Sequence, residues 1–129
     1  MGYVLKRIDE MEAIFHGRCK LAAEELGVQS FGLQAIDLPA GADDYPEHDH
    51  AEDGQEEVYL ALAGSAEFEL DGRRIALTPG DLLRVEPGTR RKARPGPEGV
   101  RLLVVGGVPG QVYRRPAPFR RQAGPPPAG

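Results

Sequence analysis

The sequence contains no tryptophan and a single cysteine, Cys19. One cysteine cannot form a disulfide within the chain, so no disulfide framework is expected. With no motif around it, Cys19 is predicted to be a small residue that packs on a helix. The chain also lacks any apolar run near the roughly 18 residues that a membrane-spanning helix needs. Its first residues do not follow the order of regions in a secretory signal peptide, so we expect a cytoplasmic protein with no membrane partner.

Positive charge is absent from one long stretch of the chain. Residues 40–57 contain eight acidic residues and no lysine or arginine. Arginines predominate instead from residue 84 onward, so the charges are segregated although the net charge is only −4. Such blocks are either two solvated surfaces or two parts of one fold that attract each other. The net negative charge and the presence of only four tyrosines and four phenylalanines argue against nucleic acid as the main partner.

Length and composition predict one domain with extensions at both ends. At 129 residues the chain is long enough for one core and too short for two. The run CKLAAEELG combines good helix formers with Gly27, so a short helix is expected near residues 18–26. Residues 1–29 are assigned to an N-terminal extension and residues 30–113 to the main fold. Residues 114–129 are expected to be a disordered tail, because their proline-rich sequence offers little apolar surface to offset the entropy of ordering.

Between residues 30 and 107, short alternating or apolar runs are separated by glycine and proline. Asp71 and Gly72 separate two such runs, and Asp-Gly in this position predicts a two-residue hairpin in which both turn residues have positive φ. Alternation places Phe68 on the face opposite Glu67. Six or more strands at a spacing of about ten residues are typical of an all-β sandwich or barrel. The predicted helix is then a small addition to an all-β fold.

The stretch PEHDHAEDGQEE brings two histidines close to a carboxylate. His48 and His50 are two residues apart, so in an extended chain both side chains leave the same face. Glu57 begins the next predicted strand, and the loop before it is short enough to return it alongside the histidines. Two imidazoles and one carboxylate are a suitable ligand set for a divalent metal such as iron. The alternative is that both histidines are solvated turn residues in an acidic loop.

Alternation along the strand that begins at Glu57 identifies further residues inside the barrel. If Glu57 points inward, Tyr59, Ala61 and Ala63 share its face, and the two alanines leave room for a small ligand near Tyr59. The alternative is that Tyr59 is a core residue whose hydroxyl is hydrogen-bonded to a carbonyl group. Gln34, on the preceding predicted strand, is a further candidate for a polar residue of the binding pocket.

Taken in order, the runs HDH, EEVYLALAG, ELDG, LTPGD and EPGT resemble the two sequence motifs of the cupin superfamily. The resemblance covers residues from about 30 to 107 and implies a double-stranded β-helix, the small jelly-roll barrel of that superfamily, with one short N-terminal helix. It also selects Glu57 rather than Glu56 as the metal ligand, although the gap between His50 and Glu57 is slightly longer than is usual in the family. The residues that match the first motif are Gly41, His48, His50, Glu57 and Gly64.

One position departs from the family pattern in a way that bears on function. Cupins with four protein ligands take the last one from a histidine at the position of Arg91, and a guanidinium group has no lone pair to offer a cation. Three arrangements remain open. Arg91 forms a salt bridge with Glu57 and replaces the metal, or it binds an anionic substrate beside a metal held by three ligands. In the third arrangement Arg91 points outward as part of a basic strand.

The resemblance leads to two hypotheses for function. The first is a small-molecule enzyme of oxidoreductase or isomerase type that uses iron, manganese, zinc or nickel on His48, His50 and Glu57 and takes a small anionic ligand. The second is a metal-free binding or sensing module in which a Glu57–Arg91 pair stands in place of the metal. Single-domain cupins commonly pair through the edges of their sheets, so a homodimer is also expected.

Overall fold

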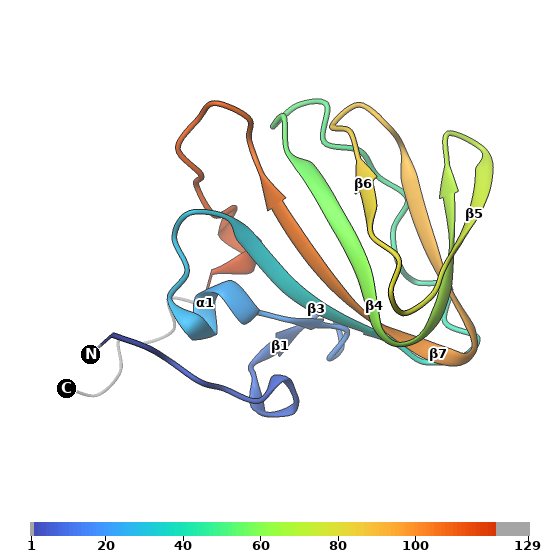
Figure 1. Ribbon diagram of the computed structural model, residues 1–129, viewed down its shortest axis with the longest axis horizontal. Coiled ribbons are helices and arrows are strands. Elements are labelled where there is room, and N and C mark those ends of the chain that lie inside the picture. Colours follow the sequence, from blue (N-terminus) through green and yellow to red (C-terminus); the bar gives the residue numbers. More distant parts are fainter. Residues whose placement is uncertain (1, 121–129) are drawn as a thin grey trace.

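The structure is a computed structural model that describes residues 2–120, and its dominant feature is an antiparallel sheet of seven strands in the order β1-β2-β3-β7-β4-β5, with β6 paired to β4. Figure 1 shows this sheet rolled into a barrel, so the predicted all-β jelly-roll fold is confirmed. The strands are β1 (Ala13–Ile14), β2 (Cys19–Lys20), β3 (Gly32–Leu38), β4 (Glu56–Leu70), β5 (Arg73–Leu77), β6 (Leu83–Val85) and β7 (Arg91–Gly107). The helices are α1 (Ala22–Leu26) and two short 3-10 helices, η1 (Ile8–Glu10) and η2 (Ala117–Phe119).

Two strands are much longer than the sequence pattern predicted. β4 has 15 residues and joins two runs, EEVYLALAG and SAEFEL, that had been expected to alternate separately, and β7 has 17 residues and begins well before the predicted strand GVRLLVVGG. The long strands bend where the register between them shifts, beside the positive-φ residues Gly64 in β4 and Gly99 in β7. A β-bulge re-aims the side chains that follow it, which is why Ala63 is exposed instead of sharing the inward face of Glu57.

The Asp-Gly hairpin is confirmed. Asp71 has φ 48° and Gly72 has φ 85°, and the flanking residues Leu70 and Arg73 pair across β4 and β5. This register keeps Phe68 fully buried while Glu67 is exposed. A slip of one residue would exchange the two faces, so the turn fixes which side of β4 forms the core.

The core lies between the two walls of the barrel. Its largest fully buried apolar side chains include Tyr59, Phe68, Leu77, Val85 and Leu102, which come from four different strands. The rings of Tyr59 and Phe68 meet edge to face, with their centroids 4.8 Å apart. Burying a side chain of this size stabilises the fold by roughly 1.5–3 kcal/mol relative to an exposed position. Packing of these residues therefore holds β4, from which the candidate site projects.

The predicted helix is shorter than expected. α1 covers Ala22–Leu26 and ends at Gly27, whose positive φ of 78° gives the predicted C-terminal stop. The residues before α1 form β2 instead, because Cys19 and Lys20 pair with Ile36 and Ala35 of β3. Cys19 is buried, but it packs on the sheet and not on a helix. Among residues 2–120, no helix is both long enough and apolar enough to cross a membrane.

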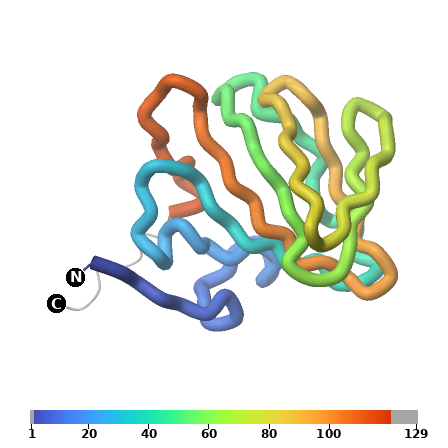
Figure 2. Tube along the Cα trace, viewed as in Figure 1, coloured from blue at the N-terminus to red at the C-terminus, as the bar shows by residue number. Residues whose placement is uncertain are grey.

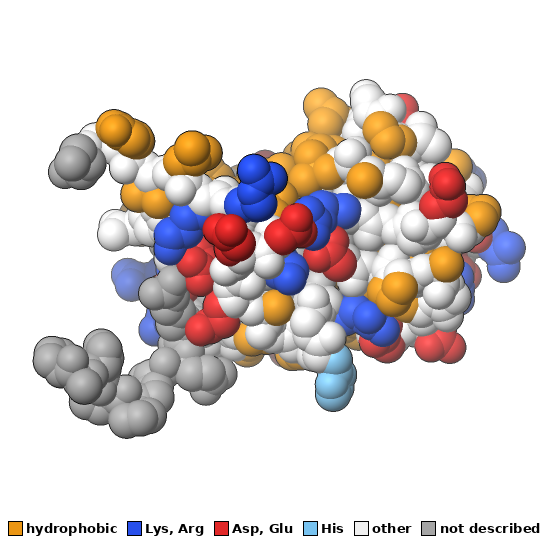
Figure 3. Space-filling view, turned by 90° about the horizontal axis from the view of Figure 1, so that it is seen from below, with side chains coloured by type: hydrophobic (Ala, Val, Ile, Leu, Met, Phe, Trp, Pro, Cys, Tyr) orange, Lys and Arg blue, Asp and Glu red, His pale blue; other side chains and the backbone are white. Residues whose placement is uncertain are grey.

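The segregated charges meet in the folded chain. Arg84 binds Glu56 at 3.0 Å, and Arg90 lies 3.5 Å from Asp49, so basic residues of the second half pair with the acidic stretch. Lys92 adds hydrogen bonds to two backbone carbonyls of that stretch. Oppositely charged side chains also lie next to one another on the face seen in Figure 3. Of the two alternatives, mutual attraction within one fold is the one the structure adopts.

The residues after β7 pack on the same side of the barrel as the N-terminal segment (Figure 2). Arg115 binds Glu24 at 2.7 Å and donates to the carbonyl of Val28. Phe119 meets Phe15 edge to face at a centroid distance of 6.3 Å. Residues 114–120 of the predicted tail thus contact the N-terminal segment through an ion pair and an aromatic pair. The remainder of the predicted tail, residues 121–129, lies outside the described residues.

The close approach of β4 and β7 makes Gly64 sensitive to substitution. A Cβ atom at Gly64 would lie 2.0 Å from the carbonyl oxygen of Gly99, in a backbone conformation with φ +69°. Gly64→Ala is expected to lower the free energy of unfolding by about 2–5 kcal/mol, the sum of a left-handed backbone penalty and overpacking. Urea unfolding measures the change. Gly80→Ala is the control, because Gly80 also has positive φ but no neighbouring atom within 4 Å. Equal losses in the two variants would contradict this account.

Candidate metal centre and its cavity

Three strands and one loop bring the predicted ligands together. The loop that carries His48 is tied to the first residue of β7, because His48 and Arg91 exchange two backbone hydrogen bonds of 3.0 and 2.8 Å. The backbone nitrogen of His50 donates to Pro87 at 2.7 Å. Glu57, near the start of β4, pairs with Val85 of β6 and Gly106 of β7. One potential ligand atom from each of His48, His50 and Glu57 lies within 4.8 Å of the others.

Both imidazoles are oriented by a hydrogen bond on the same ring nitrogen. His48 Nδ1 lies 3.0 Å from the carbonyl oxygen of Pro46, and His50 Nδ1 lies 3.0 Å from a carboxylate oxygen of Asp53. Both partners can only accept, so each Nδ1 carries a hydrogen and each Nε2 is left for another contact. His50 Nε2 is buried without a hydrogen bond to any described residue, and lies 3.4 Å from Glu57 Oε1 without alignment for one. Metal-binding histidines are usually held in this way.

The two oxygens of Glu57 have different surroundings. Oε1 accepts a hydrogen bond of 2.6 Å from the hydroxyl of Tyr59 and one of 2.8 Å from Nη1 of Arg91. No hydrogen bond joins Oε2 to a described residue. Burial alone would raise the pKa of Glu57, but the contacts with His50 and Tyr59 and the charge of Arg91 outweigh it, so the pKa lies below its usual value. Glu57 is therefore ionised at neutral pH and has one oxygen left for a ligand.

Arg91 points inward and its side chain is completely buried, so the outward arrangement is not the one adopted. Besides Glu57, its guanidinium donates to the backbone carbonyls of Glu86 and Thr89, with Nη2 at 2.8 and 2.9 Å and Nε at 3.2 Å from Thr89. Glu57 borders the cavity, whereas Arg91, which contacts Glu57, is not part of the cavity wall. This placement removes the residue on which the expectation of an anionic ligand rested.

Tyr59 and Gln34 lie in different places. Tyr59 is fully buried, and its hydroxyl bonds to the Glu57 carboxylate and lies 3.2 Å from the hydroxyl of Tyr45. Burial is the main cause of a raised pKa at both tyrosines, so both remain protonated hydroxyl donors. Tyr45, unlike Tyr59, borders the cavity, and so does Gln34 of β3. Of the proposed ligand-binding residues, only Gln34 is therefore in a position to touch a ligand in the cavity.

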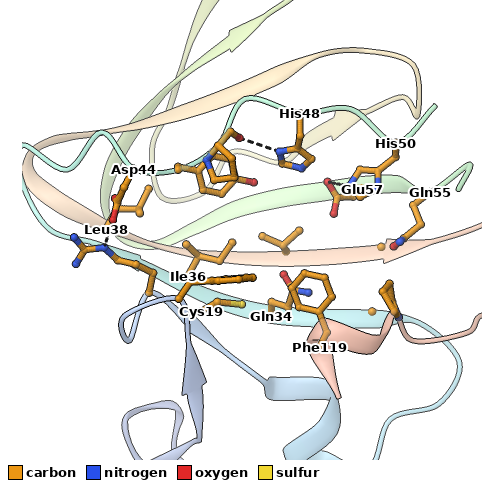
Figure 4. Close-up of a pocket in the computed structure, with 18 of the residues that line it drawn as sticks. Cys19, Gln34, Ile36, Leu38, Asp44, His48, His50, Gln55, Glu57 and Phe119 are labelled. Atoms are coloured by element: carbon orange, nitrogen blue, oxygen red, sulfur yellow. Dashed lines mark hydrogen bonds and ion pairs between the residues drawn. The ribbon is translucent and has the colours of Figure 1, made fainter. Parts of the chain in front are cut away.

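A cavity of about 570 Å³ opens beside the His48–His50–Glu57 cluster. Figure 4 shows Glu57, His50 and Gln55 at one end, Asp44 and Leu38 at the other, and Ile36, Gln34 and Phe119 between them. Two glycines that pair across β3 and β7, Gly32 and Gly106, also border it. A Cβ at Gly106 would lie 3.0 Å from the side-chain oxygen of Gln55, so the absence of a side chain keeps this end open.

Several residues of the cavity were not identified from the sequence. Phe15 and Phe119 come from the terminal segments that had been assigned to an extension and a tail, and Tyr113 is the last residue of the predicted main fold. No local pattern marks them, because their place at the cavity depends on how both ends of the chain pack on the barrel. Asp53 and Gln55 lie inside the motif itself, and the hydrogen bonds from His50 Nδ1 and from the Gln55 amide to Asp53 could have been anticipated from their spacing.

The residues present fit a divalent metal. His48 and His50 would each supply Nε2 and Glu57 would supply its carboxylate, and all three residues also border the cavity. Imidazole and carboxylate ligands suit iron, manganese, zinc and nickel. Arg91 weakens the attraction for a cation, because its charge already compensates that of Glu57. The arrangement is thus a three-ligand site with a modest net charge, oriented by Pro46, Asp53, Tyr59 and Arg91.

The fold is an antiparallel β-barrel in which a His-x-His pair and a glutamate form a cluster that could hold a metal ion. The chain matches the family described as Cupin domain over residues 35–106, more than half of its length, and belongs to that family. No curated protein matches the chain.

Three solved structures illustrate the range of similar barrels. A cupin protein from Bacteroides fragilis has a TM-score of 0.68 and 22% identity over 90% of this chain and 92% of its own. A sugar phosphate isomerase of the cupin superfamily from Silicibacter pomeroyi has a TM-score of 0.65 and 21% identity, over 85% and 75%. The Cupin_2 domain of an XRE family transcriptional regulator from Enterobacter cloacae has a TM-score of 0.54 and 22% identity, over 69% and 87%. Similarity at this level shows a shared fold.

Removing the guanidinium of Arg91 leaves Glu57 as a buried charge with no partner. Arg91→Met is expected to lower the free energy of unfolding of the chelator-treated protein by about 3–5 kcal/mol. Urea unfolding measures the loss. Arg90→Met is the matched control, because the neighbouring Arg90 is half exposed and its substitution is expected to change stability by less than about 0.5 kcal/mol. A loss below about 1 kcal/mol for Arg91→Met would show that the pair does not stabilise the barrel.

The pKa of His50 is expected to lie above the usual 6.5 in the metal-free protein, chiefly because of the nearby Glu57 carboxylate. A raised pKa means that proton binding stabilises the fold below the unfolded value, and that this contribution is lost as pH rises through the folded value. Metal affinity has the opposite dependence, since a metal must displace the same proton. NMR titration of the ring protons measures the midpoint. Asp53→Asn should lower it, because Asp53 also favours the charged ring, and a wild-type midpoint at or below 6.5 would contradict the prediction.

Proposed function

We propose that this cupin binds a small molecule in the cavity beside a divalent metal held by His48 Nε2, His50 Nε2 and Glu57 Oε2. The observation that carries the proposal is the orientation of the two imidazoles. Their Nδ1 atoms are engaged by Pro46 and Asp53, and the buried Nε2 of His50 has no hydrogen-bond partner among the described residues. A lone pair buried without a donor is costly, and a metal ion at this point would satisfy it.

When bound, the metal supplies a Lewis acid that polarises an oxygen of the ligand. The chain's own residues then position that ligand. Gln34 and Gln55 border the same cavity and can hydrogen-bond polar groups of a bound molecule, while the Tyr45 hydroxyl, whose proton is donated to Tyr59, can accept a hydrogen bond. Chemistry of the oxidoreductase or isomerase type remains our prediction for this site, and one of the similar barrels is described as a sugar phosphate isomerase.

A second candidate function is metal-free binding or sensing. The observation that favours it is the 2.8 Å contact between Arg91 and Glu57, in which the positive charge expected of a metal is already supplied by the protein. A cupin domain of a transcriptional regulator is among the similar structures, which is consistent with a sensing role.

A homodimer also remains our prediction. It is supported by the outer edges of β1 and β5, which pair with no other strand among the described residues.

Metal content separates the two functions. The protein, purified without an affinity tag and incubated in turn with iron(II), manganese(II), zinc(II) and nickel(II), is expected to retain close to one ion per chain of at least one metal after gel filtration. Elemental analysis gives the stoichiometry. His50→Ala and Glu57→Gln should each lose the ion, because either change removes one of three ligands. His16→Ala is the control, since His16 borders the cavity but is not part of the cluster.

Failure of the wild-type protein to retain any of these ions would contradict the metal proposal. If the wild-type protein retains none of the four ions while Arg91→His retains one, Arg91 has replaced the metal. The metal-free binding module would then be the function that remains.

A further inference from the structure

The charges that border the cavity are already paired. Arg18 is its one arginine or lysine among the described residues, and Arg18 Nε lies 3.1 Å from a carboxylate oxygen of Asp44. At the other end, Glu57 is compensated by Arg91 from behind. The cavity therefore offers a phosphate or carboxylate group no arginine or lysine that is free of a carboxylate partner, and it presents two carboxylates that would repel such a group.

The wall between the two ends is mainly apolar, with the side chain of Gln34 as a polar group within it. Ile36, Leu38 and Val104 of β3 and β7 line the cavity together with Phe119, and its volume of about 570 Å³ is within the usual range for small-molecule sites. A sugar in this space would place hydroxyls against these apolar side chains, which cannot form hydrogen bonds. Burying a hydroxyl without a partner costs roughly 1–3 kcal/mol, so the wall disfavours a polyhydroxylated ligand.

The terminal segments complete the wall at some conformational cost. Phe15, His16 and Gly17 have φ values of 55°, 58° and 80°, three successive residues in the left-handed region at the tip of the β1–β2 hairpin. This backbone is unfavourable for a bulky residue such as phenylalanine. It brings Phe15 against Phe119 at a centroid distance of 6.3 Å, and both rings border the cavity. Conformations of this kind persist where the surrounding structure, and often a binding site, requires them.

We propose that the ligand of this cavity is an uncharged, mainly apolar small molecule with one polar group directed toward His48, His50 and Glu57, and that sugar phosphates are not its ligands. The inference rests on the proposed use of this cavity as the binding site and specifies the class of molecule that it takes. Phe15 and Phe119 cover the apolar part of that molecule, and the pairing of Arg18 with Asp44 is what excludes anions.

Displacement of an uncharged dye tests the ligand class. N-phenyl-1-naphthylamine fluoresces in apolar surroundings, and 1-naphthol, 1-naphthyl phosphate and glucose 6-phosphate are added as competitors, to chelator-treated protein and to protein loaded with zinc(II). We expect 1-naphthol to displace the dye at least about tenfold more effectively than 1-naphthyl phosphate in both states, because the two differ only in the charged group. Glucose 6-phosphate should not displace it. Tighter binding of either phosphate compound than of 1-naphthol, in either state, would overturn the proposal.

Two variants connect the result to the cavity. Phe119→Ala should weaken dye binding about tenfold, while Phe31→Ala, at a half-exposed phenylalanine away from the cavity, should leave it unchanged. Asp44→Asn frees Arg18 from its carboxylate and should raise the affinity for 1-naphthyl phosphate several-fold. Unchanged dye binding in Phe119→Ala, with the variant's folding verified by circular dichroism, would place the dye elsewhere and overturn the assignment.

The experiment separates this inference from the proposed metal site. Dye binding to the chelator-treated protein depends on the cavity alone, whereas retention of an ion depends on the cluster. A protein that binds 1-naphthol but no metal would support the ligand class and contradict the metal proposal.

Discussion

The buried ion pair between Glu57 and Arg91 is the interaction on which the rest of the site depends. A guanidinium with no exposed surface requires acceptors for its donors, and it obtains them from Glu57 and from the carbonyls of Glu86 and Thr89. These contacts tie the turn before β7 to β4. They also occupy one carboxylate oxygen of Glu57, and so leave the other without a hydrogen bond to a described residue. The same pair orients a metal ligand and lowers its negative charge.

Two sets of residues surround this pair: the hydrogen-bond partners of the cluster and the aromatic residues of the terminal segments. Nearest to it, Asp53, Pro46 and Tyr59 hold the side chains of His50, His48 and Glu57 by hydrogen bonds, so the cluster is ordered before any ligand arrives. Farther out, the terminal segments supply aromatic side chains that enclose an apolar space. The Glu24–Arg115 ion pair holds the C-terminal segment there. Barrel and terminal segments therefore contribute different properties: the barrel supplies the polar end and the terminal segments supply the cover.

The sequence predicted the features that depend on local chemistry. The Asp71–Gly72 turn followed from its positive-φ requirement, and the convergence of His48, His50 and Glu57 followed from strand alternation and a short loop. What it did not predict depends on distant contacts. β4 continues through Gly64, where it approaches Gly99 of β7 closely and the register between the two strands shifts, and Ala63 is exposed as a result. The roles of Phe15 and Phe119 arise only when residues about one hundred positions apart meet, which no local pattern encodes.

Anomalous diffraction from crystals grown with zinc(II) or manganese(II) tests the central claim most directly, because it locates an ion and shows Arg91 in the same experiment. The account predicts one strong peak bounded by His48 Nε2, His50 Nε2 and Glu57 Oε2, with Arg91 still bonded to Glu57 Oε1. A cluster without a peak would contradict it. A peak that appears only with Arg91 displaced from Glu57 would also contradict it, since guanidinium and metal would then compete for the same carboxylate.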